Sequence, residues 1–243
     1  GDIVFARNVI PHVKNIHSVI EGIMTLLGDS SVGVIEFHDA GLILEELHYD
    51  SIYHEHLFYF SLDTISNLLK QYNLHVFDIV QSPISGGSWV VYFSKNKRSK
   101  TATLIEVEDL ENKKRINSYG TWILFAESVK SHAKQLQHIV SQFDNQILAY
   151  GASARSSTLL NYCKFNSDKI SAIIDKNPLK NGLLTPGTNI PIISFEDGII
   201  TMKQKETILL LAWNFQDEVI SELRASGFSG KFIIPLPNNP HIL

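Results

Sequence analysis

The sequence predicts an α/β protein, and three observations lead to this class. Short apolar runs alternate with amphipathic helical stretches in the first half, which favours a mostly parallel sheet. The same alternation restarts after about residue 145. A polar stretch from about Thr101 to Gln142 has a helical pattern and predicts one or two connecting helices. We therefore expect two α/β domains, at 1–98 and 144–243, joined by a helical connector at 99–143.

The first domain is expected to begin with a buried strand at Ile3–Ala6. The helix predicted next, over 13–27, repeats apolar residues every three or four positions. Another helix is expected from Ser61, a favourable N-cap residue, to about Tyr72. Further strands are predicted at Val32–Phe37, Val76–Ser82 and Ser88–Ser94, the last two as an antiparallel pair at a sheet edge.

The second domain is expected to begin with a strand at Gln146–Tyr150, a glycine turn at Gly151 and a helix over Leu159–Tyr162. Further strands are predicted at Ile170–Ile174, Thr207–Leu211 and Lys231–Ile234. The order strand, glycine turn, helix, strand and then the acidic Asp175 is Rossmann-like.

Composition excludes several function classes. Apolar residues make up 44% of the 243 residues and the net charge is −4, so we expect a soluble protein that binds no nucleic acid. No apolar run approaches the roughly 18–20 residues that cross a bilayer, and no signal peptide is evident. The single cysteine, Cys163, excludes a disulfide framework. We expect a cytoplasmic location, and a chain that is part of a longer protein because it begins within a strand.

The most informative residues are Tyr53-His54-Glu55-His56. Four adjacent groups that exchange protons or hydrogen bonds are costly among aromatic neighbours unless chemistry requires them. We favour acid–base chemistry. Two alternatives remain: a metal site, for which the i, i+2 histidine spacing suits only a strand, and ordinary surface histidines. His12 ends a second segment of similar composition.

Six short motifs follow one another along nearly the whole chain. They are Asn8-(x)3-His12, Tyr53-x-Glu55-His56, Gly86-Gly87-Ser88, Tyr150-Gly151-Ala152-Ser153-Ala154-Arg155, Thr185-Pro186-Gly187 and Ala212-Trp213-Asn214. This succession resembles the S-adenosylmethionine (SAM)-dependent C-methyltransferases that act on nucleotide-linked keto-deoxysugars. The resemblance implies the C-terminal part of a Rossmann-like methyltransferase domain followed by a second Rossmann-like domain. The family's N-terminal zinc module and glycine-rich SAM motif have no counterpart in this sequence, so no metal ligand is predicted.

The resemblance also implies roles for individual residues. His56 matches the base that removes the C3 proton of a 4-keto sugar, and an unperturbed imidazole pKa near 6.5 suits that task. Glu55 would orient the imidazole or hold a sugar hydroxyl, while Tyr53 and His12 would donate hydrogen bonds to the enolate oxygen. His54 matches no family role. A His12 that merely caps the next helix is the structural alternative.

Cofactor and substrate contacts are expected at the ends of strands. Arg7 and Asn8 are the candidates for the methionine part of SAM. The helix after Gly151 offers N–H groups to a diphosphate, with Ser153 and Arg155 as added donors. The remaining candidates for the nucleotide sugar are Lys180, Trp213, Asn214, Gly86, Gly87 and Ser88. The structural alternative for Lys180 is a solvated lysine, and that for Trp213 and Asn214 is packing between the domains. The alternative for Gly86-Gly87-Ser88 is a hairpin turn that requires positive φ.

The predicted function is SAM-dependent C-methylation of a nucleoside-diphosphate 4-keto-deoxyhexose at C3. One rival is a non-catalytic module that binds nucleotide sugars. The other is an NAD(P)-dependent oxidoreductase or epimerase, although the turn at Gly151 lacks the second and third glycines of the dinucleotide fingerprint.

Overall fold

The computed structural model describes residues 1–143 and 145–243, apart from the side chain of Ser85. Its internal contacts divide the chain into two compact units. Unit 1 comprises residues 1–45 and 54–124, and unit 2 comprises residues 46–53 and 125–243. These boundaries differ from the expected ones, because residues 46–53 group with the second unit and the connector is shared between both.

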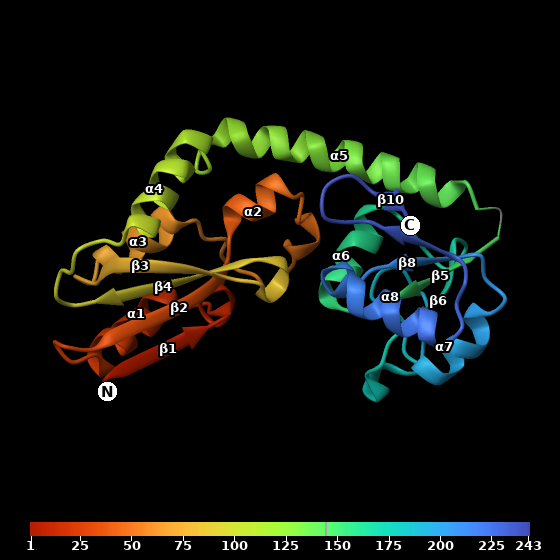
Figure 1. Ribbon diagram of the computed structural model, residues 1–243, viewed down its shortest axis with the longest axis horizontal. Coiled ribbons are helices and arrows are strands. Elements are labelled where there is room, and N and C mark those ends of the chain that lie inside the picture. Colours follow the sequence, from red (N-terminus) through yellow and green to blue (C-terminus); the bar gives the residue numbers. More distant parts are fainter. Residues whose placement is uncertain (144) are drawn as a thin grey trace. The chain divides into compact units, whose positions relative to one another are not determined.

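Unit 1 contains a four-stranded sheet in the order β1-β2-β4-β3 (Figure 1). Strands β1 and β2 are parallel, whereas β4 runs antiparallel to both of its neighbours. The predicted hairpin of two strands at a sheet edge is therefore confirmed. The bounds are β1 Ile3–Arg7, β2 Val32–His38, β3 His75–Ser82 and β4 Ser88–Ser94.

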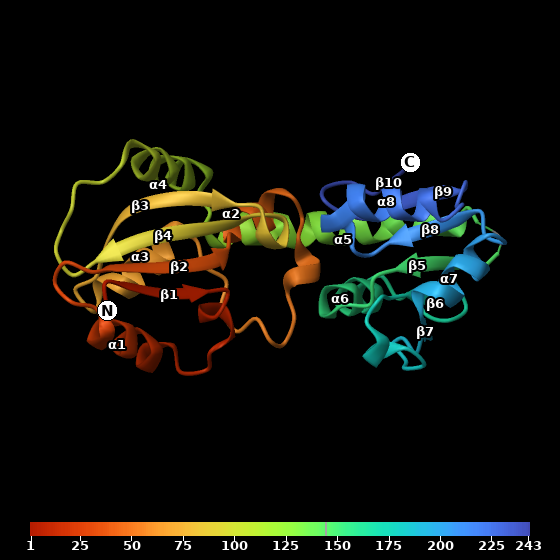
Figure 2. The same cartoon turned by 60° about the horizontal axis from the view of Figure 1, so that its bottom comes forward.

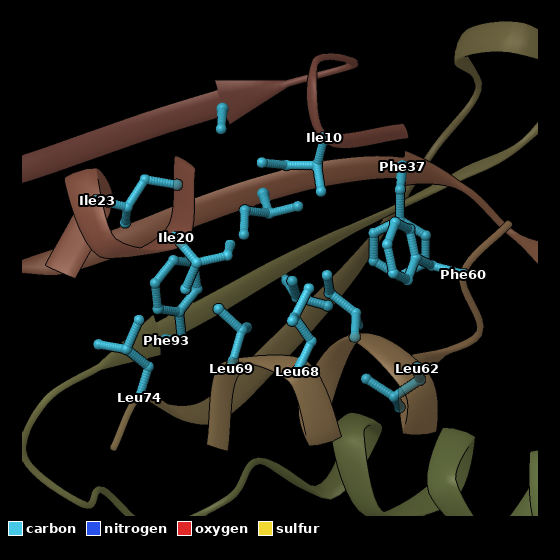
Figure 3. Packing of buried hydrophobic residues seen from close by; sticks show 14 of the residues in the cluster. Ile10, Ile20, Ile23, Phe37, Phe60, Leu62, Leu68, Leu69, Leu74 and Phe93 are labelled. Carbon is cyan, nitrogen blue, oxygen red and sulfur yellow. The ribbon is translucent and has the colours of Figure 1, made fainter. Parts of the chain in front are cut away.

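Unit 1 has the helices α1 Ile16–Leu26, α2 Ala40–Glu45, α3 Leu62–Lys70 and α4 Ala102–Lys114. Helices α1, α3 and α4 of unit 1 contribute to an apolar core against this sheet. Figure 3 shows Phe93 from the sheet beside Ile20 of α1 and Leu69 of α3, in a cluster that also holds Ile23 and Leu68. Ser61 caps α3 as predicted: its hydroxyl accepts the Thr64 N–H while the Thr64 hydroxyl accepts the Ser61 N–H.

Strand β1 forms where predicted, but the expectation that it is buried is wrong. It is the edge strand of the sheet, and the side chains of Ile3 and Phe5 are 55% and 64% exposed. Val4 and Ala6, which alternate with them, pack into the core. An apolar run does not reveal whether one or both of its faces are covered.

Unit 2 contains a six-stranded sheet in the order β10-β9-β8-β5-β6-β7 (Figure 2). All neighbouring pairs are parallel except β9 and β10. The chain winds outward in one direction through β5, β6 and β7 and then in the other through β8 and β9. The bounds are β5 Ile147–Tyr150, β6 Ile170–Ile174, β7 Ile192–Ile193, β8 Thr207–Leu210, β9 Lys231–Ile234 and β10 His241–Ile242.

Helices α7 (Phe195–Met202) and α8 (Gln216–Ala225) cover one face of this sheet, and their side chains share a core with alternate strand residues. The intervening strand residues, such as Ala149 and Leu209, are also fully buried. Helix α6 spans Ala154–Tyr162 and begins five residues earlier than predicted. Helix α5 (Tyr119–Ser141) starts in unit 1 and continues into unit 2. These elements confirm the mixed α/β class with parallel strands.

Candidate functional site

In unit 1 the structure brings His12 next to Glu55 and His56. His12 ends a short 3-10 turn, Ile10–His12, that follows β1. Its ring nitrogen Nδ1 lies 3.0 Å from the carbonyl oxygen of Glu55, and its ring centroid lies 4.8 Å from that of His56. The carbonyl of Pro11 also accepts the Leu57 N–H at 2.8 Å. Segments 43 residues apart in the sequence are thus held together by the backbone.

The His12 contact settles which nitrogen carries a proton. A carbonyl oxygen only accepts hydrogen bonds, so His12 Nδ1 must be the donor and a neutral ring keeps its lone pair on Nε2. The His56 ring is half-buried and contacts Tyr59 edge to face at 6.2 Å. His54 and Glu55 have exposed side chains. The pair therefore joins an imidazole of defined tautomer to a second, partly shielded imidazole.

Arg7 and Asn8 lie at the carboxyl end of β1, as predicted. Arg7 Nε donates to Glu36 Oε2 at 2.5 Å, and the Asn8 N–H donates to the Glu36 carbonyl at 3.0 Å. Asn8 adopts a left-handed conformation with φ of 51°, which Asn tolerates better than most residues. Glu36 is fully buried, and its Oε1 has no hydrogen-bond partner among the described residues.

The Gly86-Gly87-Ser88 segment has a full structural explanation. Both glycines have positive φ, at 86° and 132°, and a Cβ on Gly87 would collide with Leu42. Ser88 is buried, and its hydroxyl donates to the Ile84 carbonyl at 3.0 Å, which closes the hairpin. These residues form the turn between β3 and β4, and a sugar contact there remains a prediction.

In unit 2, Arg155 binds a buried carboxylate. Arg155 Nε and Nη2 donate to the two oxygens of Asp50 at 3.0 and 2.8 Å, and the Trp213 indole N–H donates to Asp50 at 2.8 Å. The guanidinium also lies 4.8 Å from the Trp213 ring centroid. Arg155 was expected to clamp a diphosphate and Trp213 to contact a nucleotide. Both side chains hold the segment Glu46–Tyr53.

Tyr49 of the same segment belongs to a second buried group of side chains, with His132 and Cys163. His132 Nε2 lies 2.7 Å from the Pro235 carbonyl, so this nitrogen donates and Nδ1 accepts from the Tyr49 hydroxyl at 3.1 Å. The Tyr49 oxygen is 3.4 Å from Cys163 Sγ. Burial lowers the pKa of His132, raises that of Tyr49, and raises the pKa of Cys163 to about 11. These shifts keep all three groups neutral near pH 7.

The turn after β5 requires glycine for two reasons. Gly151 has φ of 95°, and a Cβ there would lie 2.7 Å from that of Ala212. Ser153 caps α6 through a reciprocal pair with Ser156, which occupies its hydroxyl. The glycine thus lets β5 and the segment after β8 approach closely.

Asp175 occupies the space beside the same turn. Its Oδ2 accepts the Ala152 N–H at 2.8 Å and the Lys180 ammonium at 3.0 Å, while Oδ1 accepts the Asn177 N–H at 2.9 Å. Lys180 also donates to the Ala152 carbonyl. Lys180, a predicted nucleotide contact, therefore binds Asp175 and the turn after β5.

A pocket of about 400 Å³ opens at the carboxyl ends of β5, β6 and β8. This volume lies in the range of small-molecule sites. Here the strand order reverses between β5 and β8, which is the place where open α/β sheets bind ligands. Of the predicted residues, Tyr53, Gly151, Ser153, Arg155 and Asn214 line it. The other lining residues are Tyr150, Ala152, Ala154, Asp175, Lys176, Ala212 and Phe215.

A larger pocket of about 600 Å³ lies at the opposite ends of the strands, where Ile147 and Thr207 begin β5 and β8. Its one cationic lining residue, Lys205, donates to the Gln146 carbonyl at 2.8 Å. It lacks the glycine turn and the helix N-terminus that distinguish the smaller pocket. We therefore take the pocket beside Gly151 as the candidate ligand site.

Sequence reasoning missed Asp50 and Phe215. Asp50 lies only three residues before Tyr53, and an acidic residue between aromatic residues was a usable signal. Phe215 lines the pocket and is 55% exposed. No local pattern distinguishes it from a core phenylalanine. The contact between Asp50 and Arg155 joins residues 105 apart, so spacing could not predict it.

Within the described part of the chain, no group of three or more His, Cys, Asp or Glu side chains is arranged to hold a metal ion. Across residues 1–143 and 145–243, no helix combines the length and the apolar character needed to cross a bilayer.

Comparison with known proteins identifies similar chains. A family model described as the C-methyltransferase C-terminal domain matches residues 83–237, and a methyltransferase domain model matches residues 2–79. The chain is 29% identical over 241 residues to the C-methyltransferase NovU of Streptomyces niveus. That alignment covers 97% of this chain and 57% of the relative, so the chain spans just over half the length of the protein it matches.

Proposed function

The chain belongs to the C-methyltransferase family, and we propose that it forms the proton-abstracting and nucleotide-binding parts of a SAM-dependent sugar C-methyltransferase. The substrate that we propose is a nucleoside-diphosphate 4-keto-deoxyhexose, methylated at C3. The observation that carries the proposal is the contact of His12 with Glu55 and His56. It places two imidazoles side by side on elements that the backbone fixes.

The reaction requires a base and a donor to a developing negative charge. A ketone at C4 acidifies the C3 hydrogen because the resulting carbanion delocalises as an enolate. His56 removes that proton, and His12 donates a hydrogen bond where the enolate oxygen gains charge, once its Nδ1–H is released from Glu55. Glu55 orients the His56 imidazole or holds a sugar hydroxyl. SAM, when bound, supplies an electrophilic methyl group.

The residues at the carboxyl end of β1 suit a cofactor with a cationic amino group. Glu36 Oε1 is a buried acceptor without a hydrogen-bond partner among the described residues, and such an atom is costly unless a donor reaches it. Arg7, on the other oxygen of Glu36, would meet a carboxylate. The methionine part of SAM carries both groups, so Arg7, Asn8 and Glu36 are the residues that would hold it.

The Rossmann-like sheet of unit 2 would bind the nucleotide. Its pocket lies at the strand-order reversal and combines the N-terminus of α6 with the exposed aromatic ring of Phe215. Gly151, Ser153 and Asn214 line this pocket as candidate contacts for the diphosphate and sugar. A non-catalytic nucleotide-sugar module would use the same pocket without the histidines.

The oxidoreductase alternative is less well supported. Dinucleotide enzymes use an acidic residue at the end of the second strand to bind the ribose hydroxyls. Asp175 has that place in unit 2, but both of its oxygens accept hydrogen bonds from the protein itself. Releasing them would break contacts to Ala152, Asn177 and Lys180.

Proton exchange tests the proposal without the methyl donor. The protein is mixed with a thymidine-diphosphate 4-keto-6-deoxyhexose in D₂O, and loss of the C3 proton signal is followed by NMR. We expect exchange at C3 well above the rate without protein. Binding of the sugar nucleotide with no exchange would instead indicate the binding module, and a change in NAD(P)H fluorescence would favour the oxidoreductase.

A further inference from the structure

The segment Glu46–Tyr53 is built into unit 2, although its neighbours in sequence on both sides belong to unit 1. The Glu46 carbonyl accepts the Asn238 N–H at 3.0 Å, and the buried His48 ring packs 4.7 Å from that of Trp213. Tyr49 is 4% exposed. The last residue of the segment, Tyr53, lines the pocket beside Gly151. The segment therefore delivers one side chain to the pocket.

Asp50 makes the charged contact of this segment. It is 1% exposed and accepts three hydrogen bonds, two from the Arg155 fork and one from Trp213. A buried carboxylate is tolerated only when such donors satisfy it, and loss of one partner is then severe. A fork-like, two-bond contact also fixes direction as well as distance.

The donors to Asp50 come from two walls of the pocket. Arg155 lines it from the first turn of α6, and Trp213 lies between Ala212 and Asn214, which line it after β8. Asp50 itself is not among the lining residues. The Asp50 carboxylate thus binds both walls of the pocket. Tyr53, three residues further along the same segment, lines the pocket.

We propose that Asp50 and Arg155 are positioning residues that hold Tyr53 in the wall of the nucleotide-sugar pocket. Arg155 acts through Asp50 and not by clamping the diphosphate, because its fork is committed to the carboxylate. Tyr53 then contacts the ligand and contributes to specificity. The inference rests on the proposed function only in taking the ligand of this pocket to be a nucleoside diphosphate.

A double-mutant cycle tests this role, with uridine and thymidine diphosphate as calorimetric probes. We expect Asp50→Asn and Tyr53→Ala each to weaken binding about tenfold. Because both changes act through the same side chain, the double variant should bind no more than about twofold more weakly than Tyr53→Ala alone. Asp168→Asn removes an exposed carboxylate of unit 2 and should leave the affinity for both nucleotides unchanged. Fully additive losses, or an Asp50→Asn variant that binds like the wild type, would overturn the proposal.

Amide hydrogen exchange provides a second readout that needs no ligand. Asp50→Asn should speed exchange in the peptide 46–53 at least tenfold, and Asp168→Asn should leave it unchanged. If Asp50→Asn does not fold, Arg155→Lys keeps the charge, loses the fork, and should give a smaller acceleration. Wild-type exchange rates in the folded variants would contradict the positioning role of Asp50. Absence of nucleotide binding by the wild type would instead refute the pocket's proposed ligand, while the exchange rates still decide whether Asp50 holds the segment.

Discussion

The rings of His12 and His56 lie 4.8 Å apart at an interplanar angle of 57°, although their segments are far apart in the chain. The contact depends on the backbone, since the Pro11 carbonyl and the His12 ring both bind the segment that carries His56. The position of His56 is therefore set by its neighbours Glu55 and Leu57. The proposed role of His56 in proton abstraction can be tested against the nearby His54.

His56→Asn should lower the rate of C3 proton exchange by about 10² or more, which is the usual contribution of a general base. The amide keeps a similar size but cannot take a proton at neutral pH. His54→Asn is the matched control, and its rate should stay within a few-fold of the wild type. Exchange is measured by NMR in D₂O. Equal losses in the two variants would contradict the assignment of His56 as the base.

Gly151 and Gly227 form a matched pair for the cost of a side chain at positive φ. Their φ angles are 95° and 94°, but a Cβ on Gly151 meets Ala212 whereas none of the described atoms lies within 4 Å at Gly227. Gly227→Ala should cost about 1 kcal/mol from backbone strain alone. Gly151→Ala should cost about 1–3 kcal/mol more because of overpacking. Urea unfolding measures both free-energy losses. Equal losses would show that the loop after β8, which carries Ala212, moves to accommodate the added methyl group.

His132 should make the stability depend on pH. Burial lowers its pKa in the folded state below the ordinary 6.5, so the unfolded chain binds a proton more readily. The contribution to the free energy of unfolding is therefore complete above pH 6.5 and falls as the pH drops towards the lower folded value. The slope is at most about 1.4 kcal/mol per pH unit. His132→Gln should reduce the slope of the free energy of unfolding against pH below pH 6.5. An unchanged slope would mean that other groups cause the pH dependence.

Cys163 should resist thiol reagents in the folded protein. It is fully buried, and a pKa of about 11 leaves only about one thiolate in a thousand at pH 8. Because the chain has one cysteine, the release of thionitrobenzoate from Ellman's reagent reports on this site alone. We expect slow release in buffer and rapid release in guanidinium. Rapid labelling of the folded chain would mean that the Tyr49 contact opens readily.

The sequence predicts the regular elements well because they are local. The Ser61 cap, the hairpin of β3 and β4 and the strand at Ile170–Ile174 follow from turn chemistry and periodicity. The partner of Arg155 does not follow from such local signals. A guanidinium beside a glycine turn has the composition of a phosphate site, and only the fold shows that Asp50 already fills the fork. The exposure of Phe5 likewise depends on its strand's place in the sheet.

The placement of Glu46–Tyr53 means that no single cut in the chain separates the two units. A shortened chain that begins at residue 125 would contain the whole sheet of unit 2 and still lack one of its packed pieces. Arg155 and Trp213 would lose their common acceptor, and the hollow that holds Tyr49 would be open to water. The missing piece is short enough to be supplied as a synthetic peptide. Unit 2 is therefore completed by a segment, 46–53, that lies in the sequence between two parts of unit 1.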